Sequence, residues 1–241
     1  MKILGLDTAT PATAVALLDA ATGRTLEGRD DPRPGERPRH MAALMTLVVN
    51  QMRALGVGWE DIDRIAVGVG PGTFTGLRIG VATARALAYA RDIPLVGVST
   101  LQSLALGAAR AAGPEEDAVA AVIDARRGEV FAAGWSLTDV SDPHAEPLLR
   151  PRAVRVDALA ETLLERRLKW LATGDGSVAF RAALERAGAR IPKDDSKGNR
   201  VSAIEHCRLA LGLRPGLPAA VRPEYLRLPD AEINLRAARQ P

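Results

Sequence analysis

The chain has 241 residues, 47% of them hydrophobic and 25% charged, which is enough to bury one large core or two modest ones. Basic residues exceed acidic residues by only three; 28 of the 32 basic residues are arginine, and they are scattered along the chain. With an aromatic content of only 3%, this composition argues against a protein that binds RNA by itself, and an arginine surface that touches tRNA is the alternative.

The single cysteine, Cys207, excludes an intramolecular disulfide and a Cys-x-x-Cys redox site, so we expect a buried and inert thiol. No stretch approaches the ~18 uninterrupted apolar residues that span a bilayer. Met1 leads directly into a strand pattern rather than into a signal peptide. We therefore expect a cytoplasmic protein without a membrane partner.

Three strands are predicted at the start of the chain. Apolar runs at residues 2–7 and 13–19 indicate a β-hairpin, and a third strand at 24–30, after a turn at Thr22 and Gly23, continues it as an antiparallel meander. A proline-rich loop at 32–38 separates this meander from a helix predicted at 40–55.

An apolar strand at residues 65–69 then runs into a glycine-rich turn, which opens a second helix predicted at 77–89. Both helices are apolar around most of their circumference, and between residues 41 and 49 only Thr46 is polar. A helix that packs on one sheet needs only a one-sided apolar stripe. Either the outer faces bind a partner protein, which we favour, or each helix is sandwiched inside its own domain.

The rest of the chain continues the alternation of strands and helices. Capping-box patterns at 99–102 and 202–205 mark two helix starts. The strand that ends at Asp124 begins a hairpin, as does the first strand, which ends at Asp7, so the sequence indicates a diverged duplication. The predicted strands in this part of the chain are 94–98, 118–124, 129–135 and 169–173. The predicted helices are 99–112, 156–167, one that follows residues 174–176, and 202–213. A polar loop is predicted at 139–146, and the proline-rich end of the chain is predicted to be extended.

Two halves that each begin with such a hairpin resemble the duplicated actin-like (ribonuclease-H-like, ASKHA) fold, an α/β fold with two lobes, each a mixed sheet flanked by helices. In that superfamily a nucleotide lies between the halves. Here Ala9 and Pro11 stand where glycine flexibility and free N–H groups would help to bind a phosphate. Asp7 and Asp124 are single carboxylates at strand ends, and we interpret them as hydrogen-bonding turn residues, with metal coordination as the alternative.

The glycine-rich turn at residues 70–78 has two interpretations. Free N–H groups at a helix start can hold an anion, which would make the turn a phosphate cradle. However, the turn lacks the Gly-Lys-Ser/Thr end of a P-loop and has Thr75 where Gly-x-Gly-x-x-Gly needs glycine, so we favour a tight structural connection. Arg78 could neutralise an anion, or pair with a carboxylate or a partner.

The histidines and serines do not indicate a further site. His40, His144 and His206 have no metal-ligand spacing, and no Gly-x-Ser-x-Gly motif is present. The sequence therefore predicts no self-contained active site.

The run GPGTFTGLRIG at residues 70–80 resembles the GPG-[ST]-FTGLR-[IV]-G signature of the bacterial TsaB family, also called YeaZ. The resemblance extends over nearly the whole chain, through residues 4–10, His40, 122–131 and 223–227, and is loose at about 139–200. The signature residues are Gly70, Pro71, Gly72, Thr73, Phe74, Thr75, Gly76, Leu77 and Arg78.

This resemblance implies a role in making threonylcarbamoyladenosine, a modification of the tRNA adenosine beside the anticodon in tRNAs that read codons starting with A. It implies a non-catalytic scaffold for a TsaD-like transferase, which uses a threonylcarbamoyl-adenylate made by TsaC and is joined by a TsaE-like ATPase. The implied complex contacts tRNA as a whole, and this chain needs no cofactor of its own, whereas its partners use ATP. TsaD-like proteins carry a metal-binding His-x-x-x-His, which this sequence lacks.

The resemblance also places the contacts with the transferase, or with a second copy in a homodimer, on the two apolar helices. We expect one lobe at 1–113, completed by 214–241, and the other at 114–213. The alternative function is an autonomous actin-like ATPase or phosphotransferase. The predicted interface residues are His40, Leu44, Leu47, Val48, Gln51, Arg78, Thr83 and Leu87.

Overall fold

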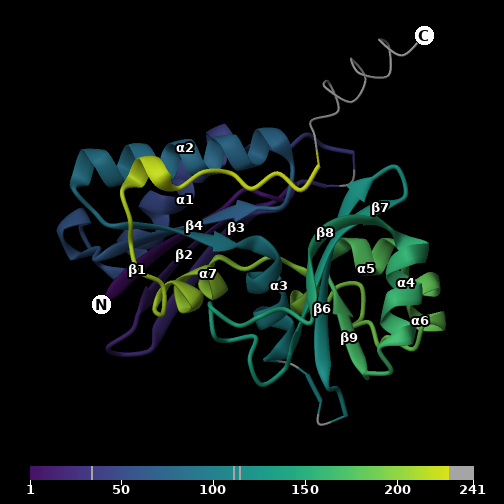
Figure 1. The fold of residues 1–241 in the computed structure, drawn as a ribbon. Helices are drawn as coiled ribbons and strands as arrows, with labels where there is room; N and C mark the ends of the chain where they lie inside the picture. The colour runs from purple at the N-terminus through teal and green to yellow at the C-terminus, as the bar shows by residue number, and fades with distance from the viewer. Residues whose placement is uncertain (34, 111, 114, 228–241) are drawn as a thin grey trace.

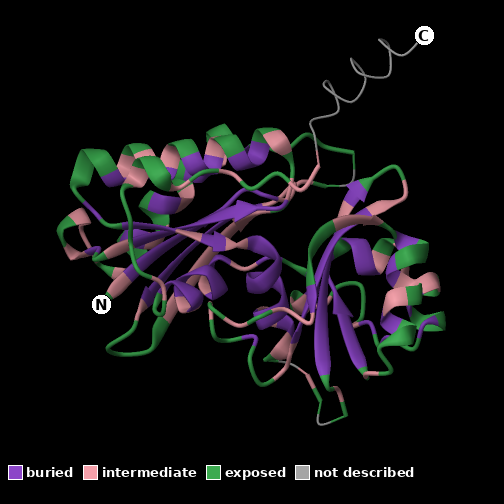
Figure 2. Ribbon diagram, viewed as in Figure 1, coloured by how far each residue is buried: buried purple, intermediate pink, exposed green. Residues whose placement is uncertain are grey.

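The computed structural model of the chain describes residues 1–33, 35–110, 112–113 and 115–227, and it has two lobes that lie side by side (Figure 1). Each lobe is a mixed sheet flanked by helices, which confirms the predicted fold class. Buried residues are concentrated in the two sheets and in the helices between them, whereas the outermost helices carry exposed faces (Figure 2).

The first lobe contains a five-stranded sheet in the order β3-β2-β1-β4-β5. The first three strands are antiparallel neighbours, and the last two run parallel to β1. Two long helices cover one face of the sheet, and their apolar sides complete the core there. The elements are β1 (Lys2–Asp7), β2 (Thr13–Asp19), β3 (Arg24–Asp30), α1 (His40–Leu55), η1 (Trp59–Asp61), β4 (Arg64–Gly70), α2 (Phe74–Arg91) and β5 (Leu95–Ser99).

The second lobe contains a four-stranded sheet in the order β8-β7-β6-β9. Three short helices lie on its outer side, and Trp170 and Leu159 are buried between sheet and helices. The elements are β6 (Ala118–Arg126), β7 (Glu129–Ser136), β8 (Leu149–Arg155), α4 (Val156–Glu165), β9 (Trp170–Thr173), α5 (Asp175–Ala179), α6 (Arg181–Arg186) and η2 (Lys197–Asn199).

The two sheets repeat one arrangement, which confirms the predicted duplication. In each lobe an antiparallel three-stranded meander is extended by a strand that runs parallel to the meander's first strand. The first strands, β1 and β6, therefore occupy equivalent central positions. Their ends at Asp7 and near Asp124 face the space between the lobes.

Two helices lie between the sheets and are exchanged between the halves of the chain. The helix α3 (Thr100–Ala109) follows a strand of the first lobe but packs against β6 and β7 of the second. The helix α7 (Ala203–Ala210) follows the second lobe but packs beneath β1 and β2 of the first. One hydrophobic cluster consequently runs from Ile3 and Ala16 through both helices to Val119 and Ala121.

The predicted elements are present, with differences at their ends. Helix α2 begins at Phe74 rather than at 77, because the Thr73 side chain accepts a hydrogen bond from Gly76 N and starts the helix earlier. The predicted capping boxes are half formed. Ser99 caps α3, but the Gln102 side chain instead donates to the carbonyl oxygens of Val140 and Asp142.

At the second box, Ser202 caps α7 by accepting from Ile204 N, while the Glu205 carboxylate pairs with Arg208. Strand β8 is absent from the sequence prediction. It is an edge strand that is mostly exposed, with three arginines and one proline, so it lacks the apolar alternation of a central strand.

The segment after α7 returns to the first lobe. Gly216 forms a bridge with Leu95, a short turn η3 (Pro218–Ala220) follows, and Glu224 N donates to Val69 O at 2.7 Å. Residues 228–241, which we expected to complete this lobe, lie outside the described residues. Within the described part of the chain, no helix is both long and apolar enough to cross a membrane.

Candidate functional site

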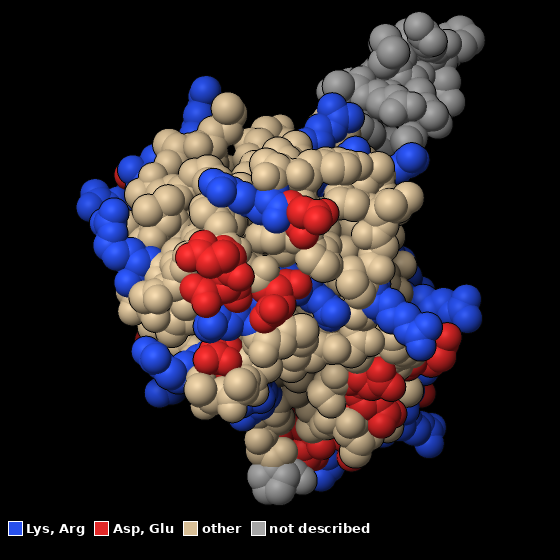
Figure 3. Space-filling model, turned by 90° about the vertical axis from the view of Figure 1, so that its left-hand side faces the viewer, with Lys and Arg blue, Asp and Glu red and all other residues tan. Residues whose placement is uncertain are grey.

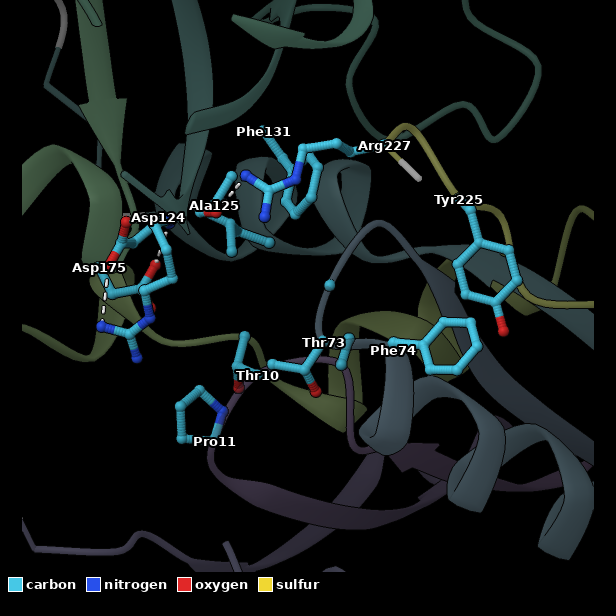
Figure 4. A pocket seen from close by; sticks show the side chains of 14 residues that line it. Thr10, Pro11, Thr73, Phe74, Asp124, Ala125, Phe131, Asp175, Tyr225 and Arg227 are labelled. Carbon is cyan, nitrogen blue, oxygen red and sulfur yellow. Dashed lines mark hydrogen bonds and ion pairs between the residues drawn. The ribbon is translucent and has the colours of Figure 1, made fainter. Parts of the chain in front are cut away.

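A cleft of about 210 Å³ lies between the lobes, where the first turns of the two meanders face each other. Figure 4 shows the side chains that line it. Three of the chain's eight Phe, Tyr and Trp residues are among them. The lining residues are Ala9, Thr10, Pro11, Gly72, Thr73, Phe74, Ile123, Asp124, Ala125, Arg126, Phe131, Asp175, Tyr225 and Arg227.

Asp7, at the end of β1, is buried and fully engaged in hydrogen bonds. Its Oδ1 accepts from Ala9 N at 2.9 Å, and its Oδ2 lies 2.8 Å from Nε2 of the buried His206 on α7. Thr100 Oγ1 adds a longer contact of 3.4 Å to Oδ2. Asp7 is therefore a hydrogen-bonding residue that ties β1 to two helices, as we favoured. Among the described residues, no three His, Cys, Asp or Glu side chains are grouped as metal ligands.

Three N–H groups of the glycine-rich turn donate to acceptors within the protein. Thr73 N donates to Ala9 O at 2.7 Å, Gly70 N donates to Thr100 Oγ1 at 3.2 Å, and Gly76 N donates to Thr73 Oγ1 at 3.3 Å. An anion at this position would have to displace these bonds. The turn is therefore a structural connection, which agrees with the interpretation we favoured.

Three glycines of the turn and of α2 allow the first meander turn to approach the helix closely. A Cβ atom at Gly72 would lie 2.3 Å from Ala9 O, one at Gly76 would lie 1.9 Å from Thr8 O, and one at Gly80 would lie 2.3 Å from Thr8 Oγ1. Thr8 Oγ1 also donates to Gly76 O at 2.7 Å. The four-residue spacing of these glycines is visible in the sequence, but its packing partner, some 70 residues away, is not.

Arg78 contacts aromatic rings rather than an anion. Its guanidinium lies 3.8 Å from the centroid of the Phe74 ring, and its Nε donates to Tyr225 Oη at 3.2 Å. The Phe74 and Tyr225 rings lie 5.1 Å apart. Sequence reasoning missed Tyr225 and Arg227 as cleft residues, because nothing local to the extended end of the chain indicates where it packs.

Two carboxylates of the second lobe line the cleft, Asp124 on β6 at the second meander turn and Asp175 at the start of α5. Asp124 forms an ion pair of 3.2 Å with Arg126, and its N–H donates to Asp175 Oδ1 at 3.0 Å. Part of the Asp175 side chain reaches solvent, yet the protein around it displaces water and, together with the Asp124 charge, raises the pKa of Asp175. Sequence reasoning read Gly174-Asp175-Gly176 only as a helix start and so missed this residue.

The predicted interface residues do not all lie on the surface. His40, Leu44 and Val48 are buried in the first lobe, and we correct them to core positions. His40 Nδ1 lies 2.9 Å from Thr13 Oγ1, and burial lowers the pKa of His40. A helix that packs on a sheet must bury one side, and these three residues form that side of α1.

The other predicted interface residues are accessible to different degrees. Arg78 is exposed, whereas Leu47, Gln51, Thr83 and Leu87 are half-buried. Leu47 and Leu87 also pack against the core of the first lobe, so neither is a purely outward position.

The outer faces of α1 and α2 carry apolar side chains that the prediction did not single out. Met41 is 83% exposed, Met45 38% and Val49 45%, and their spacing of four places them on one side of α1. Tyr89 on α2 is 60% exposed. These side chains form the apolar face, defined here as Met41, Met45, Val49 and Tyr89.

A family model described as TsaD, tRNA N6-adenosine threonylcarbamoyltransferase, matches residues 35–182. The chain is also 35% identical over 183 residues to the tRNA threonylcarbamoyladenosine biosynthesis protein TsaB of Escherichia coli, a match that covers 75% of this chain and 74% of that protein. The chain belongs to the TsaB family. The resemblance seen in the signature at 70–80 is thereby confirmed.

Solved structures agree with this membership. A Pseudomonas aeruginosa structure, titled as an uncharacterized protein with similarity to peptidase YEAZ, is 28% identical with a TM-score of 0.75, covering 94% of this chain and 99% of that one. The ethanolamine utilization protein EutJ of Carboxydothermus hydrogenoformans, at 12% identity and a TM-score of 0.50, covers 87% of this chain and 90% of that one. That second likeness concerns the fold alone.

Proposed function

We propose that this chain acts in the biosynthesis of threonylcarbamoyladenosine in tRNA as a non-catalytic subunit that binds a TsaD-type transferase and supports its reaction. The family membership supports the pathway, since the E. coli relative is named for this biosynthesis. The apolar face on α1 and α2 is the single observation that carries the role as a binding subunit.

The cleft offers little support for chemistry of its own. Its volume of about 210 Å³ is below the about 300–1,000 Å³ typical of small-molecule pockets. Three N–H groups of the glycine-rich turn donate to Ala9 O, Thr100 Oγ1 and Thr73 Oγ1, which leaves fewer donors for a phosphate. We therefore propose that the chain needs no cofactor, while its partners use ATP.

Contact of this chain with tRNA is proposed to occur only within the complex. Figure 3 shows one face of the molecule, on which basic and acidic side chains are interspersed rather than separated. Autonomous nucleic-acid binding usually relies on a continuous basic surface. A TsaE-like ATPase and a second copy of this chain are further proposed partners.

Substitutions on the apolar face test the proposed interface. Met45→Glu combined with Val49→Glu places two charges on the outer side of α1, where desolvating them against a partner is costly. We expect the TsaD-type transferase of the same organism to stop co-purifying with the double variant. Far-UV circular dichroism and thermal melting check that the variant is folded.

Leu164→Glu is the matched control, because Leu164 is also an exposed apolar side chain, 61% accessible, but lies on α4 of the other lobe. It should leave co-purification unchanged. A folded Met45/Val49 double variant that still binds the transferase as the wild type does would refute this interface.

The alternative function is an autonomous actin-like ATPase or phosphotransferase. Calorimetry of the isolated chain with ATP and magnesium distinguishes it from the proposed binding subunit. Tight binding would support the alternative, and we expect none. Reconstituting tRNA modification with and without the chain tests the role in the pathway directly. Salt-dependent binding of tRNA to the isolated chain would indicate direct RNA contact.

A further inference from the structure

The last described residues of the chain lie across one side of the interlobe cleft and contact both lobes. In Figure 1 this segment, drawn in yellow, passes along α2 to the side where the two lobes meet. Glu224 N bonds Val69 O at the end of β4, and the carbonyl oxygen of Glu224 approaches Gly70 so closely that a Cβ there would lie 2.7 Å from it. The segment is thus fixed to the first lobe up to residue 224.

Tyr225 extends this attachment over the start of α2. Its ring packs on Phe74, and its hydroxyl accepts from Arg78 Nε at 3.2 Å. Phe74 and Arg78 lie in the first turns of α2, so the residues that begin this helix also hold the end of the chain. Figure 4 shows Tyr225 beside Phe74 on the first-lobe side of the cleft.

Two residues later the segment contacts the second lobe. Arg227 donates to Ala125 O at 2.8 Å and to Glu129 Oε2 at 2.9 Å, on the two strands that flank the second meander turn. Only 19% of the Arg227 side chain and 35% of the Glu129 side chain are exposed, so water competes less with this ion pair than on an open surface.

The lobes are also joined elsewhere, by the shared cluster around α3 and α7. That cluster reaches the second meander turn at Ile123, Ala125 and Phe131, and Leu226 packs against it. The contacts of Tyr225 and Arg227 span the two sides of the cleft near the meander turns. The lobes are therefore joined by the central cluster and, across the cleft, by the segment that carries Tyr225 and Arg227.

We propose that residues 221–227 form a clasp that sets how far the two lobes open, with Tyr225 anchored on the first lobe and Arg227 on the second. The proposal concerns the isolated chain and does not depend on any partner. Loss of either anchor removes a contact that holds the two sides of the cleft together and lets the cleft widen.

Distance measurements between spin labels on the full chain test the clasp. Ala21→Cys in the β2–β3 turn and Glu161→Cys on α4 place one exposed label on each lobe, away from the clasp and from the apolar face. The natural Cys207 is buried, so it does not compete for the label. Pulsed electron paramagnetic resonance then gives the distribution of interlobe distances.

Arg227→Ala and Glu129→Ala remove the two sides of one ion pair, and both should shift the distribution toward longer, broader distances. The double variant should shift it no further than Arg227→Ala alone, because that substitution already removes the ion pair with Glu129 as well as the bond to Ala125 O. Tyr225→Ala removes the anchor on the first lobe, and it should also shift the distribution of interlobe distances toward longer values.

Arg222→Ala is the matched control, since Arg222 is an exposed arginine on the same segment, and it should leave the distribution unchanged. Circular dichroism of each variant verifies the fold. Unchanged distributions in Arg227→Ala and Glu129→Ala would overturn the clasp, and so would an equal shift in Arg222→Ala.

Discussion

Gly76→Ala tests whether the glycines of α2 are required by close packing. The added Cβ would lie 1.9 Å from Thr8 O and 2.5 Å from Thr73 Oγ1, and the first of these is a backbone atom that cannot rotate away. The first meander turn must move, and the hydrogen bond from Thr8 Oγ1 to Gly76 O, now 2.7 Å, is weakened or lost.

The magnitudes oppose each other and can be compared. Overpacking costs about 1–3 kcal/mol, and the lost hydrogen bond about 0.5–1.5 kcal/mol. The higher helix propensity of alanine relative to glycine stabilises the folded state by about 1 kcal/mol. The free energy of unfolding should therefore fall by about 2 kcal/mol, the difference between these midpoints. For a chain of this size that corresponds to a melting temperature lower by about 4–8 °C.

Gly107→Ala on α3 is the matched control. Its Cβ would meet Glu205 Cγ at 3.5 Å, an ordinary van der Waals contact, so the same substitution should stabilise the protein by up to about 1 kcal/mol. Thermal and urea denaturation, followed by far-UV circular dichroism, measure both variants. A Gly76→Ala variant that melts at or above the wild-type temperature would refute the close-packing argument.

Two further predictions concern titratable side chains with little exposure. Asp7→Ala removes one partner of the buried pair with His206 and should lower the free energy of unfolding by about 3–5 kcal/mol. Asp124→Ala should cost less, because the Asp124 side chain is 19% exposed and its partner Arg126 is 73% exposed, so solvent screens their ion pair. Urea denaturation compares the two variants. Burial raises the pKa of Glu205, although Arg208 lies beside it, so the folded state retains a proton at pH values where the unfolded state has released it. The stability of the wild type relative to Glu205→Gln should therefore fall as the pH rises from the unfolded-state pKa near 4.5 through the higher folded-state pKa. Urea midpoints of both proteins at pH 4 and pH 7 measure this difference, and an unchanged difference would contradict it.

Much of the local structure is determined by the sequence itself. Apolar runs bounded by turns located eight of the nine described strands, and helix periodicity located α1, α2 and α7 within a few residues. These signals are local, because the apolar and polar residues within a strand or helix repeat with the period of that element. The run at 70–80 was also sufficient to indicate the family, and the repeated hairpins were sufficient to indicate the duplication.

Tertiary structure decided which surfaces face each other. An apolar helix looks the same in sequence whether its core side is at His40, Leu44 and Val48 or elsewhere, and only packing on the sheet leaves Met41 and Val49 outside. The exchange of α3 and α7 between lobes likewise leaves no local pattern, since each is simply a buried helix.

The glycines of the run at 70–80 and the end of the chain also show which features the sequence predicts and which depend on tertiary packing. Glycines in the run at 70–80 indicate a tight turn, but only the folded chain shows that Gly72, Gly76 and Gly80 pack against Thr8 and Ala9. Arg227 meets Glu129 across 98 residues of sequence, at a point fixed by the arrangement of both lobes. Sequence periodicity indicates that a residue is buried. Which residues bury it depends on how segments that are distant in the sequence pack together.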